Sequence, residues 1–309
     1  NWQFRRKLVK ENKTTNFDFI GSAKLFVGIS VALVVISIGL LVSKGLNYGI
    51  DFAGGTEIQV RFSETVNTNQ VREAVAGMGF SKAQVQSFAE GNEFVVRLPS
   101  AEGKSEKEIN KENNATIQKA REGLSTQFSG AEIRRVDSVG PQIGSELKKN
   151  GVLAVLYALL LILIYVGLRF DYEFAPGAVV CLFHDAIITL GIFSLLGKEV
   201  NVQTLAAILT IIGYSLNDTI VNYDRIRENI TNKISKNLKE VINISINETL
   251  SRTIWTSLTT MLAVVALYFV GKGVIADFAF TLGIGVIVGT YSSIYVASPI
   301  VLALSKKKA

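Results

Sequence analysis

The sequence predicts an α-helical membrane protein of six spanning helices, with one α+β domain inserted between the first helix and the second. Hydrophobic residues make up 49% of the 309 positions, and charged residues make up only 19%. The charges are concentrated in residues 1–24, 44–150 and 222–252 and at the last few positions, and the remaining runs are nearly free of charge. A chain with this distribution has two solvents, and its apolar runs face lipid.

The first apolar run, Leu25 to Val42, contains 18 residues without a charge. A bilayer core of about 30 Å requires roughly 20 residues of helix, so this run is just long enough to span. A cleaved signal peptide is the alternative, but its apolar region would be too long and no small-x-small cleavage site follows. We therefore expect residues 1–24 to form a cytoplasmic N-terminal segment and residues 25–44 to form the first transmembrane helix.

Residues 45–147 form the long polar stretch and are expected to be an extracytoplasmic domain. Period-two alternation predicts strands, and apolar residues on one face before Gly79 predict a helix. The predicted strands and helices are, in order, 57–62, 68–78, 85–88, 94–98, 105–128 and 131–136. The order β-α-β-β-α-β is typical of a ferredoxin-like α+β domain. Pro141 and the glycines near it end the domain.

The remaining residues, 148–302, are expected to form transmembrane helices two to six. The five apolar runs lie near 151–168, 174–196, 203–222, 253–270 and 275–302. Gly283, Gly285 and Gly289 in the last run form a small-residue face, which lets helices approach closely in lipid. The amphipathic segment 223–251 either lies along the inner membrane surface or folds into a helical hairpin under the bundle. Residues 303–309 form a basic cytoplasmic tail.

The positions of Lys and Arg predict the orientation in the membrane. If the N-terminus is cytoplasmic, the inner segments carry sixteen of these residues, whereas the two short outer loops carry only Lys198 and Lys272. Cytoplasmic loops are enriched in Lys and Arg, and long domains cross the membrane regardless of their charge. Both termini are therefore expected inside and the domain outside. The net charge of +6 reflects this orientation and gives no reason to expect a nucleic-acid partner.

An ionisable residue at membrane depth is costly unless it is paired or hydrated, so each one is a candidate functional residue. Asp218 lies about five residues before the cytoplasmic end of the predicted fourth helix. Tyr214 and Asn222 lie one turn away on either side of it, with Ser215 alongside, and these residues make a polar stripe.

Arg252 begins the fifth helix and has its own stripe, with Thr256 one turn on and then Thr259 and Thr260. Because the fourth and fifth helices run in opposite directions, Arg252 and Asp218 fall at a similar membrane level. A pair of this kind suits a proton relay, since moving the two charges apart would release or capture a proton. The alternatives are a static ion pair, or an arginine that only extends to the lipid headgroups.

His184 and Asp185 in the third helix are secondary candidates. A buried His beside an Asp can serve a proton path, although such a pair is more often a satisfied interhelical hydrogen bond. His184 is the only histidine and Cys181 the only cysteine, which excludes a multi-histidine metal site, an intrachain disulfide and a zinc site. No nucleophile elbow or phosphate-binding loop is present. We therefore expect no enzyme activity, no metal and no cofactor.

Several stretches carry a family resemblance. They are 47–56 (NYGIDFAGGT), 139–144 (VGPQIG), 213–219 (GYSLNDT) with 224–229 (DRIREN), 249–253 (TLSRT) with 256–260 (TSLTT), and 289–293 (GTYSS). Together they resemble the SecF subunits of bacterial protein translocases, in the SecD/SecF family of the RND superfamily. The resemblance runs from residue 47 to residue 298.

The resemblance implies a six-helix half of an RND-like transporter, which pairs with SecD and associates with the SecYEG channel in the bacterial inner membrane. It implies that the complex drives late steps of polypeptide export with the proton-motive force. The family's proton path implies roles for Asp218 and Arg252, with Asn217 and Thr256 beside them. Asn222 departs from the family, which usually has an apolar residue there. The alternatives are half of a small-molecule or lipid exporter, or a passive assembly subunit.

Overall fold

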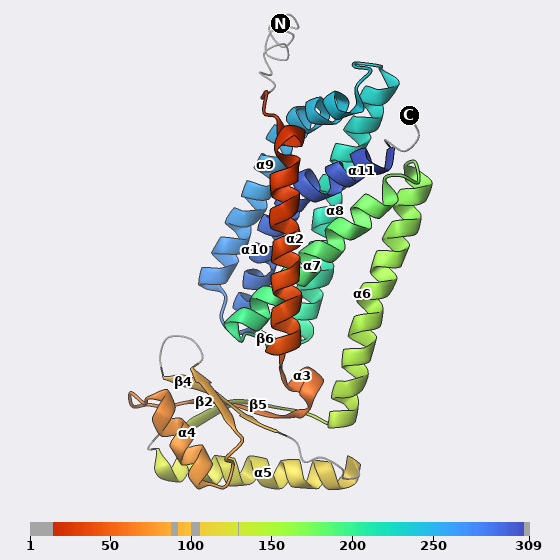
Figure 1. Cartoon of the computed structure of the whole chain (residues 1–309). Helices are drawn as coiled ribbons and strands as arrows, with labels where there is room; N and C mark the ends of the chain where they lie inside the picture. Colours follow the sequence, from red (N-terminus) through yellow and green to blue (C-terminus); the bar gives the residue numbers. More distant parts are fainter. Residues whose placement is uncertain (1–14, 88–91, 100–105, 129, 306–309) are drawn as a thin grey trace, which may run out of the picture.

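The computed structural model describes residues 15–87, 92–99, 106–128 and 130–305. Residues 1–14 of the expected cytoplasmic segment and 306–309 of the expected basic tail lie outside these ranges, as do residues 88 and 105 of two predicted elements. Figure 1 shows a bundle of long helices with a small α+β domain at one end. The first helix begins, and the last helix ends, at the opposite end of the bundle.

Within the described ranges, six helical spans are long and apolar enough to cross a membrane. They are α2 (Phe19–Ser43), α6 (Pro141–Arg169), α7 (Ala175–Leu196), α8 (Val202–Thr231), α9 (Leu238–Val270), and a last span made of α10 (Val274–Ser292), the π-helix η1 (Ser293–Ala297) and α11 (Ser298–Ser305). The predicted bundle of six membrane helices is confirmed. Several helices continue beyond their apolar runs, because a helix needs no apolar residues once it extends into water.

Residues 223–251 belong mainly to the ends of two long helices. The chain continues as α8 to Thr231, turns, and restarts as α9 at Leu238. Asn237 caps the new helix by accepting a hydrogen bond from the N–H of Lys239 at 3.1 Å. Figure 1 shows the first part of α9 crossing the end of the bundle before the helix turns along it. The segment therefore combines a helical hairpin with a stretch that lies across the bundle end.

The core of the bundle consists of α7, α8 and α10. Small residues allow these helices to approach closely. A side chain at Gly285 of α10 would collide with Ile211 of α8, and a Cβ at Gly289 would lie 3.0 Å from the Cβ of Ser215. Two of the three predicted small residues, Gly285 and Gly289, thus lie where α10 packs against α8, whereas Gly283 faces Val264 of α9.

The inserted domain, residues 55–139, has the predicted order of strands and helices. Its elements are β2 (Gly55–Arg61), α4 (Thr68–Gly77), β3 (Gln84–Ser87), β4 (Glu93–Leu98), α5 (Glu106–Gln127) and β5 (Glu132–Val139). The strands form one antiparallel sheet in the order β3-β4-β2-β5. Alternate residues of β2, Ile58 and Val60, are buried against Val71 and Leu124 of the two helices. Figure 1 shows α5 on the face of the sheet that points away from the bundle.

Short elements connect the inserted domain to the bundle. Strand β1 (Asn47–Tyr48) pairs in parallel with β6 (Glu199–Val200), which directly precedes α8. The single-turn helix α3 (Ile50–Ala53) follows β1. Two-residue strands leave no periodic pattern in a sequence, and the sequence did not predict this pairing.

Helix α2 is fastened to the last helices of the chain. The side-chain amide of Asn247 in α9 accepts from the N–H of Phe17 and donates to its C=O, both at 2.9 Å. Asn243 also donates to the Phe17 C=O at 3.0 Å. Further along α2, the hydroxyl of Tyr291 in α10 donates to the C=O of Phe26 at 2.7 Å. The first helix is therefore held by residues more than 200 positions away.

Candidate proton site in the membrane bundle

Asp218 lies on the buried face of α8 and is only 3% exposed. Ser215, Thr219 and Asn222 share this face and are also buried, so the predicted polar stripe points into the bundle. The Oδ2 atom of Asp218 has no hydrogen-bond partner among the described residues. A buried carboxylate oxygen without a partner is costly, and such an exception in a native structure calls for an explanation.

Arg252 of α9 lines an open cavity of about 420 Å³ at the end of the bundle opposite the inserted domain. The lining residues are Tyr165, Arg169, Phe170, Ile220, Val221, Asp224, Arg225, Glu228, Glu248, Thr249 and Arg252. Within the described part of the chain, Arg252 forms no ion pair within 4.0 Å, whereas Arg225 pairs with Glu248 at 2.6 Å. Arg252 is the nearby charge that acts on Asp218. Among the described residues, however, no ion pair within 4.0 Å joins the two side chains.

The two residues predicted beside this pair occupy different environments. Asn217 is exposed on the outer surface of α8, away from the interior. The hydroxyl of Thr256 donates to the C=O of Arg252 and to that of Thr253, both at 3.0 Å. Thr256 therefore satisfies its hydroxyl on its own helix, and Asn217 does not contact the carboxylate of Asp218.

Asp185 of α7 lies at the centre of the bundle in a dense polar cluster. One carboxylate oxygen is 2.9 Å from Nδ1 of His184. The other accepts from the hydroxyls of Ser215 at 2.6 Å and Ser292 at 2.9 Å. Cys181, one turn before Asp185, donates to the same Ser292 hydroxyl. Asp185 is fully buried, and its two carboxylate oxygens contact residues of α7, α8 and α10.

His184 has one ring nitrogen, Nε2, without a partner among the described residues. Its ring stacks on Tyr291 with centroids 6.3 Å apart. Because Ser215 lies three residues before Asp218 on α8, its bond to Asp185 joins the two polar clusters through one helix face. The sequence had indicated His184 and Asp185, and it had placed Ser215 beside Asp218 and Ser292 in the run 289–293. It did not predict that the two serines bind Asp185.

Asn222 connects α8 to α9 and to the π-helix. It accepts a hydrogen bond from the hydroxyl of Thr249 at 2.7 Å, and its amide donates to the C=O of Ser293 at 3.5 Å. The wide turn of η1 leaves this carbonyl available, and Ser298 also donates to it at 3.2 Å. Single-turn π-helices occur often at functional sites. Thr249 also lines the open cavity, so Asn222 lies between that cavity and the interior.

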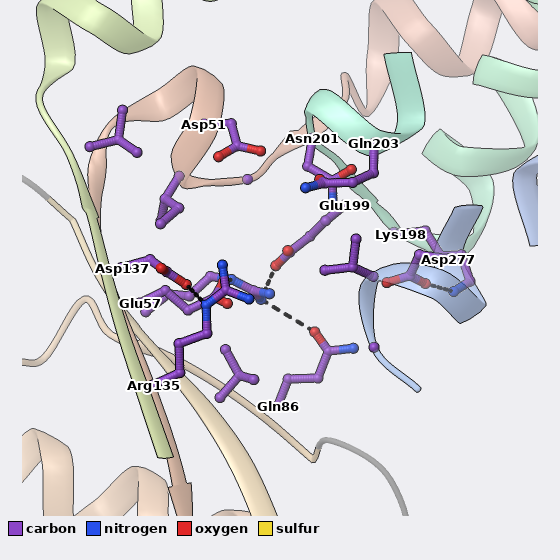
Figure 2. Close-up of a pocket in the computed structure, with 18 of the residues that line it drawn as sticks. Asp51, Glu57, Gln86, Arg135, Asp137, Lys198, Glu199, Asn201, Gln203 and Asp277 are labelled. Carbon is purple, nitrogen blue, oxygen red and sulfur yellow. Dashed lines mark hydrogen bonds and ion pairs between the residues drawn. The ribbon is translucent and has the colours of Figure 1, made fainter. Parts of the chain in front are cut away.

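A second polar site lies between the inserted domain and the bundle, around a cavity of about 480 Å³. Arg97 of β4 donates to Glu57 at 2.7 Å and to Gln86 at 3.3 Å, and it forms an ion pair with Glu199 of β6. Figure 2 shows Glu199 pointing from the bundle side toward the sheet. Burial raises the pKa of Glu199, and the charge of Arg97 opposes this shift.

Other charges at this site pair on their own side of the cavity, as Arg135 does with Asp137 on β5 at 2.6 Å. Lys198 pairs with Asp277 at the start of α10, with 2.9 Å between Nζ and Oδ1. In the ranges that the structure describes, no group of three His, Cys, Asp or Glu side chains is arranged to hold a metal ion. Among the buried side-chain nitrogen and oxygen atoms of the described residues, Asp218 Oδ2 and His184 Nε2 are the two without a hydrogen-bond partner.

Two family models match the chain. Residues 119–307 match the model described as "Protein export membrane protein SecD/SecF, C-terminal", and residues 39–66 match the "SecD/SecF GG Motif". The first match contains Asp185, Asp218 and Arg252. The second contains Gly54 and Gly55, at the junction of the bundle and the inserted domain.

Curated relatives match over almost the whole chain. The protein translocase subunit SecF of Calditerrivibrio nitroreducens is 46% identical over 297 residues, which cover 96% of this chain and 95% of the relative. The protein translocase subunit SecF of Magnetococcus marinus is 47% identical over 298 residues, with 94% and 93% covered.

Among solved structures, SecDF from Thermus thermophilus, a translocon-associated membrane protein, matches with a TM-score of 0.83 at 40% identity. A second structure of SecDF, in a super-membrane-facing form, matches with a TM-score of 0.70 at the same identity. The matches cover 94% and 95% of this chain but only 39% of the SecDF chain. Sequence and structure agree, and the chain belongs to the SecD/SecF family of protein export membrane proteins, among its SecF subunits.

Proposed function

We propose that the chain is the SecF subunit of a protein-export machine in the bacterial inner membrane. It works with SecD and the SecYEG channel, and it drives late steps of polypeptide translocation with the proton-motive force. The names of the relatives and the match to SecDF support the export role. The observation that carries the proton-driven part is Asp218, a buried acid near Arg252. Within the described ranges, one oxygen of Asp218 has no hydrogen-bond partner and Arg252 has no ion pair.

In this proposal, the open cavity at Arg252 admits water from the cytoplasm, and Asp218 exchanges its proton through it. An ionised Asp218 attracts Arg252, and a protonated Asp218 releases it, so each proton changes the force between α8 and α9. One charge that moves through 100 mV provides about 2.3 kcal/mol. A few protons per cycle therefore suffice to shift a conformational equilibrium. Asn222 and Thr249 line the route, and His184 and Asp185 have a secondary place in it.

The proposed orientation puts both termini in the cytoplasm and residues 45–147 in the periplasm, as the distribution of Lys and Arg favours. We assign the inserted domain to the ferredoxin-like fold, which the strand order β3-β4-β2-β5 supports. Ala206, Thr210, Gly213 and Asn217 form an exposed stripe on α8, which we call the outer stripe. Small and polar residues at membrane depth are suited to contact with another helix, and this supports SecD as the partner there.

The substitution Asp218→Asn tests the proposed function. Asn retains the size of the side chain but cannot ionise. In cells whose only copy carries Asp218→Asn, we expect export of a secreted reporter to fall to the level of a deletion, with normal membrane abundance and normal copurification of SecD. Asp171→Asn, an exposed acid in the loop before α7, is the matched control and should export normally.

Unchanged export by Asp218→Asn would contradict the proposal, and it would favour a passive assembly subunit that only holds its partners together. Proton transport in vesicles that contain the chain with SecD provides an independent measurement. It should be lost in Asp218→Asn and retained in Asp171→Asn.

A further inference from the structure

The outer end of α8 is bound to the segment that leads into the inserted domain. We call residues 47–55, Arg97 and residues 199–202 the joint. The N–H of Gly49 donates to the C=O of Val200 at 2.9 Å. The carboxylate of Asp51 accepts the N–H of Val202, the first residue of α8, at 3.1 Å. An acid at this position also interacts favourably with the N-terminal end of the helix dipole.

The segment 47–55 is in turn tightly attached to the inserted domain. Gly54 and Gly55 have φ values of 74° and 135°, which L-residues with side chains rarely adopt. A Cβ on Gly54 would lie 2.8 Å from the Cα of Pro141, and a Cβ on Gly55 would lie 2.6 Å from the C=O of Leu98. These two glycines therefore allow the chain to pass between β4 and the start of α6 in close contact with the backbone of both.

An apolar contact on the bundle side holds the same segment. Phe52 of α3 packs with Phe193 of α7 and with Val200, and all three side chains are buried. The segment is thus in contact with α6, α7 and β6 at once, so it cannot shift alone without breaking several contacts. A packed interface of this kind moves as a unit or changes in discrete steps.

Arg97 is the residue through which the sheet itself reaches the bundle. Its guanidinium joins Glu57 and Gln86 of neighbouring strands to Glu199, and among the described residues no other ion pair crosses from the inserted domain to the bundle. The side chains of Arg97 and Glu199 are only 18% and 13% exposed, so water screens the pair weakly. Figure 2 shows Glu199 and Gln86 converging from opposite sides of the cavity.

Helix α8 connects this joint to the candidate proton site. It runs without interruption from Val202 to Thr231, and Asp218 lies sixteen residues beyond its start, roughly 24 Å at 1.5 Å per residue. We propose that Arg97, Glu199 and Asp51 are positioning residues that make the inserted domain follow the outer end of α8, so that a displacement at Asp218 reaches the domain. This inference rests on the proposed proton-driven function, and it assigns a mechanical role to the segment around Gly54 and Gly55.

Charge reversal tests the joint in the intact chain with its partner. Glu199→Arg places a positive charge opposite Arg97, and we expect export to fall roughly tenfold, within the range of typical coupling between sites. The double variant Arg97→Glu with Glu199→Arg should restore export, because one positive group again lies against two carboxylates. Lys272→Glu is the matched control: it reverses an exposed charge before α10, outside the joint, and it should export normally.

A distance measurement separates coupling from stability. Cysteines replace Lys111 on α5 and Lys272 before α10, both exposed, and they carry a donor and an acceptor dye in vesicles. Cys181 is buried, which protects it from labelling. We expect a change in energy transfer when a proton gradient is applied, its loss in Glu199→Arg, and its recovery in the double variant. A structural role alone would lower abundance and would leave the response of the surviving molecules intact.

The outcomes distinguish this inference from the proposed function. In one outcome, Glu199→Arg exports normally and responds normally to the gradient, whereas Asp218→Asn loses export. This outcome would contradict the proposed role of the joint but would still agree with the proposed function. Normal export in both variants would instead reject the proton-driven function. If Glu199→Arg does not accumulate, Arg97→Gln removes the ion pair without repulsion, and the same two readouts apply to it.

Discussion

Two buried acids of the bundle differ in how their carboxylates are satisfied. Asp185 has a partner for each oxygen, from His184 and from two serines, whereas Asp218 has one oxygen without any partner among the described residues. A satisfied acid can remain in one state, but an unsatisfied one gains from a proton or from the approach of a positive group. At the scale of single residues, this difference supports the proposal that Asp218 changes its protonation state while Asp185 keeps its partners.

Glu199 gives a prediction for pH dependence. Burial raises its pKa, so the folded chain binds this proton more tightly than the unfolded chain, whose ordinary value is 4.5. The contribution of Glu199 to stability is therefore full below pH 4.5 and is lost as the pH rises through the folded-state pKa. Glu199→Gln removes this titration.

Thermal unfolding in detergent, followed over a pH series from 4.5 upward, measures the effect. We expect the melting temperature of Glu199→Gln to depend less on pH than that of the parent chain. Glu64→Gln, on an exposed residue outside the joint, should follow the parent. Identical pH profiles for Glu199→Gln and the parent would contradict the role of burial at Glu199.

At the scale of helices, packing of α10 on α8 predicts a steric effect. Gly285→Ala inserts a methyl group against Ile211 of α8, and excess volume in a packed core typically costs about 1–3 kcal/mol. We expect a lower unfolding temperature in detergent and lower abundance in the membrane. Gly39→Ala on α2, where a Cβ would meet nothing within 4 Å, provides the control. Because Ala favours a helix more than Gly does, an equal decrease at both positions would contradict the packing explanation.

The helices of the bundle could be predicted because a long charge-free run has few other stable structures in a membrane. The strands of the inserted domain could be predicted because one sheet face is buried, which imposes alternation on residues such as Ile58 and Val60. The ends of the membrane helices could not be predicted, because α2 begins at Phe19 and α6 begins at Pro141, both within polar sequence. A helix that leaves the membrane continues through water until its terminal backbone groups are capped. The composition of the sequence does not show where that end lies.

The candidate site was only partly predictable for a related reason. Asp218 and Arg252 could be recognised because a charge in an apolar run is costly. This signal comes from the local sequence and does not depend on which residue contacts the charge. The bonds of Asp185 to Ser215 and Ser292, the turn at Ser293 and the pair between Arg97 and Glu199 depend on helices and strands that meet only in three dimensions. Their residue types are ordinary, so no local pattern distinguished them.

For the whole molecule, the outer stripe of α8 predicts where the partner lies. Asn217 is polar and exposed at membrane depth, which is unfavourable in lipid and favourable against another helix. We expect Asn217→Cys, labelled with a short photoactivatable reagent, to cross-link to SecD in membranes. Leu161 of α6 is 65% exposed, and Leu161→Cys should cross-link to lipid instead. Cross-links from α6 to SecD, with none from α8, would place the partner on the other side of the bundle.

The attachment of α2 to α9 and α10 has a consequence for biosynthesis. The amides that hold Phe17 belong to Asn243 and Asn247, and the hydroxyl that holds Phe26 belongs to Tyr291. The ribosome makes these residues late in synthesis. The N-terminal end of the first helix therefore gains these hydrogen bonds only after most of the chain has been made. A chain cut short before α9 lacks Asn243, Asn247 and Tyr291, so its first helix has none of these hydrogen bonds to hold Phe17 and Phe26.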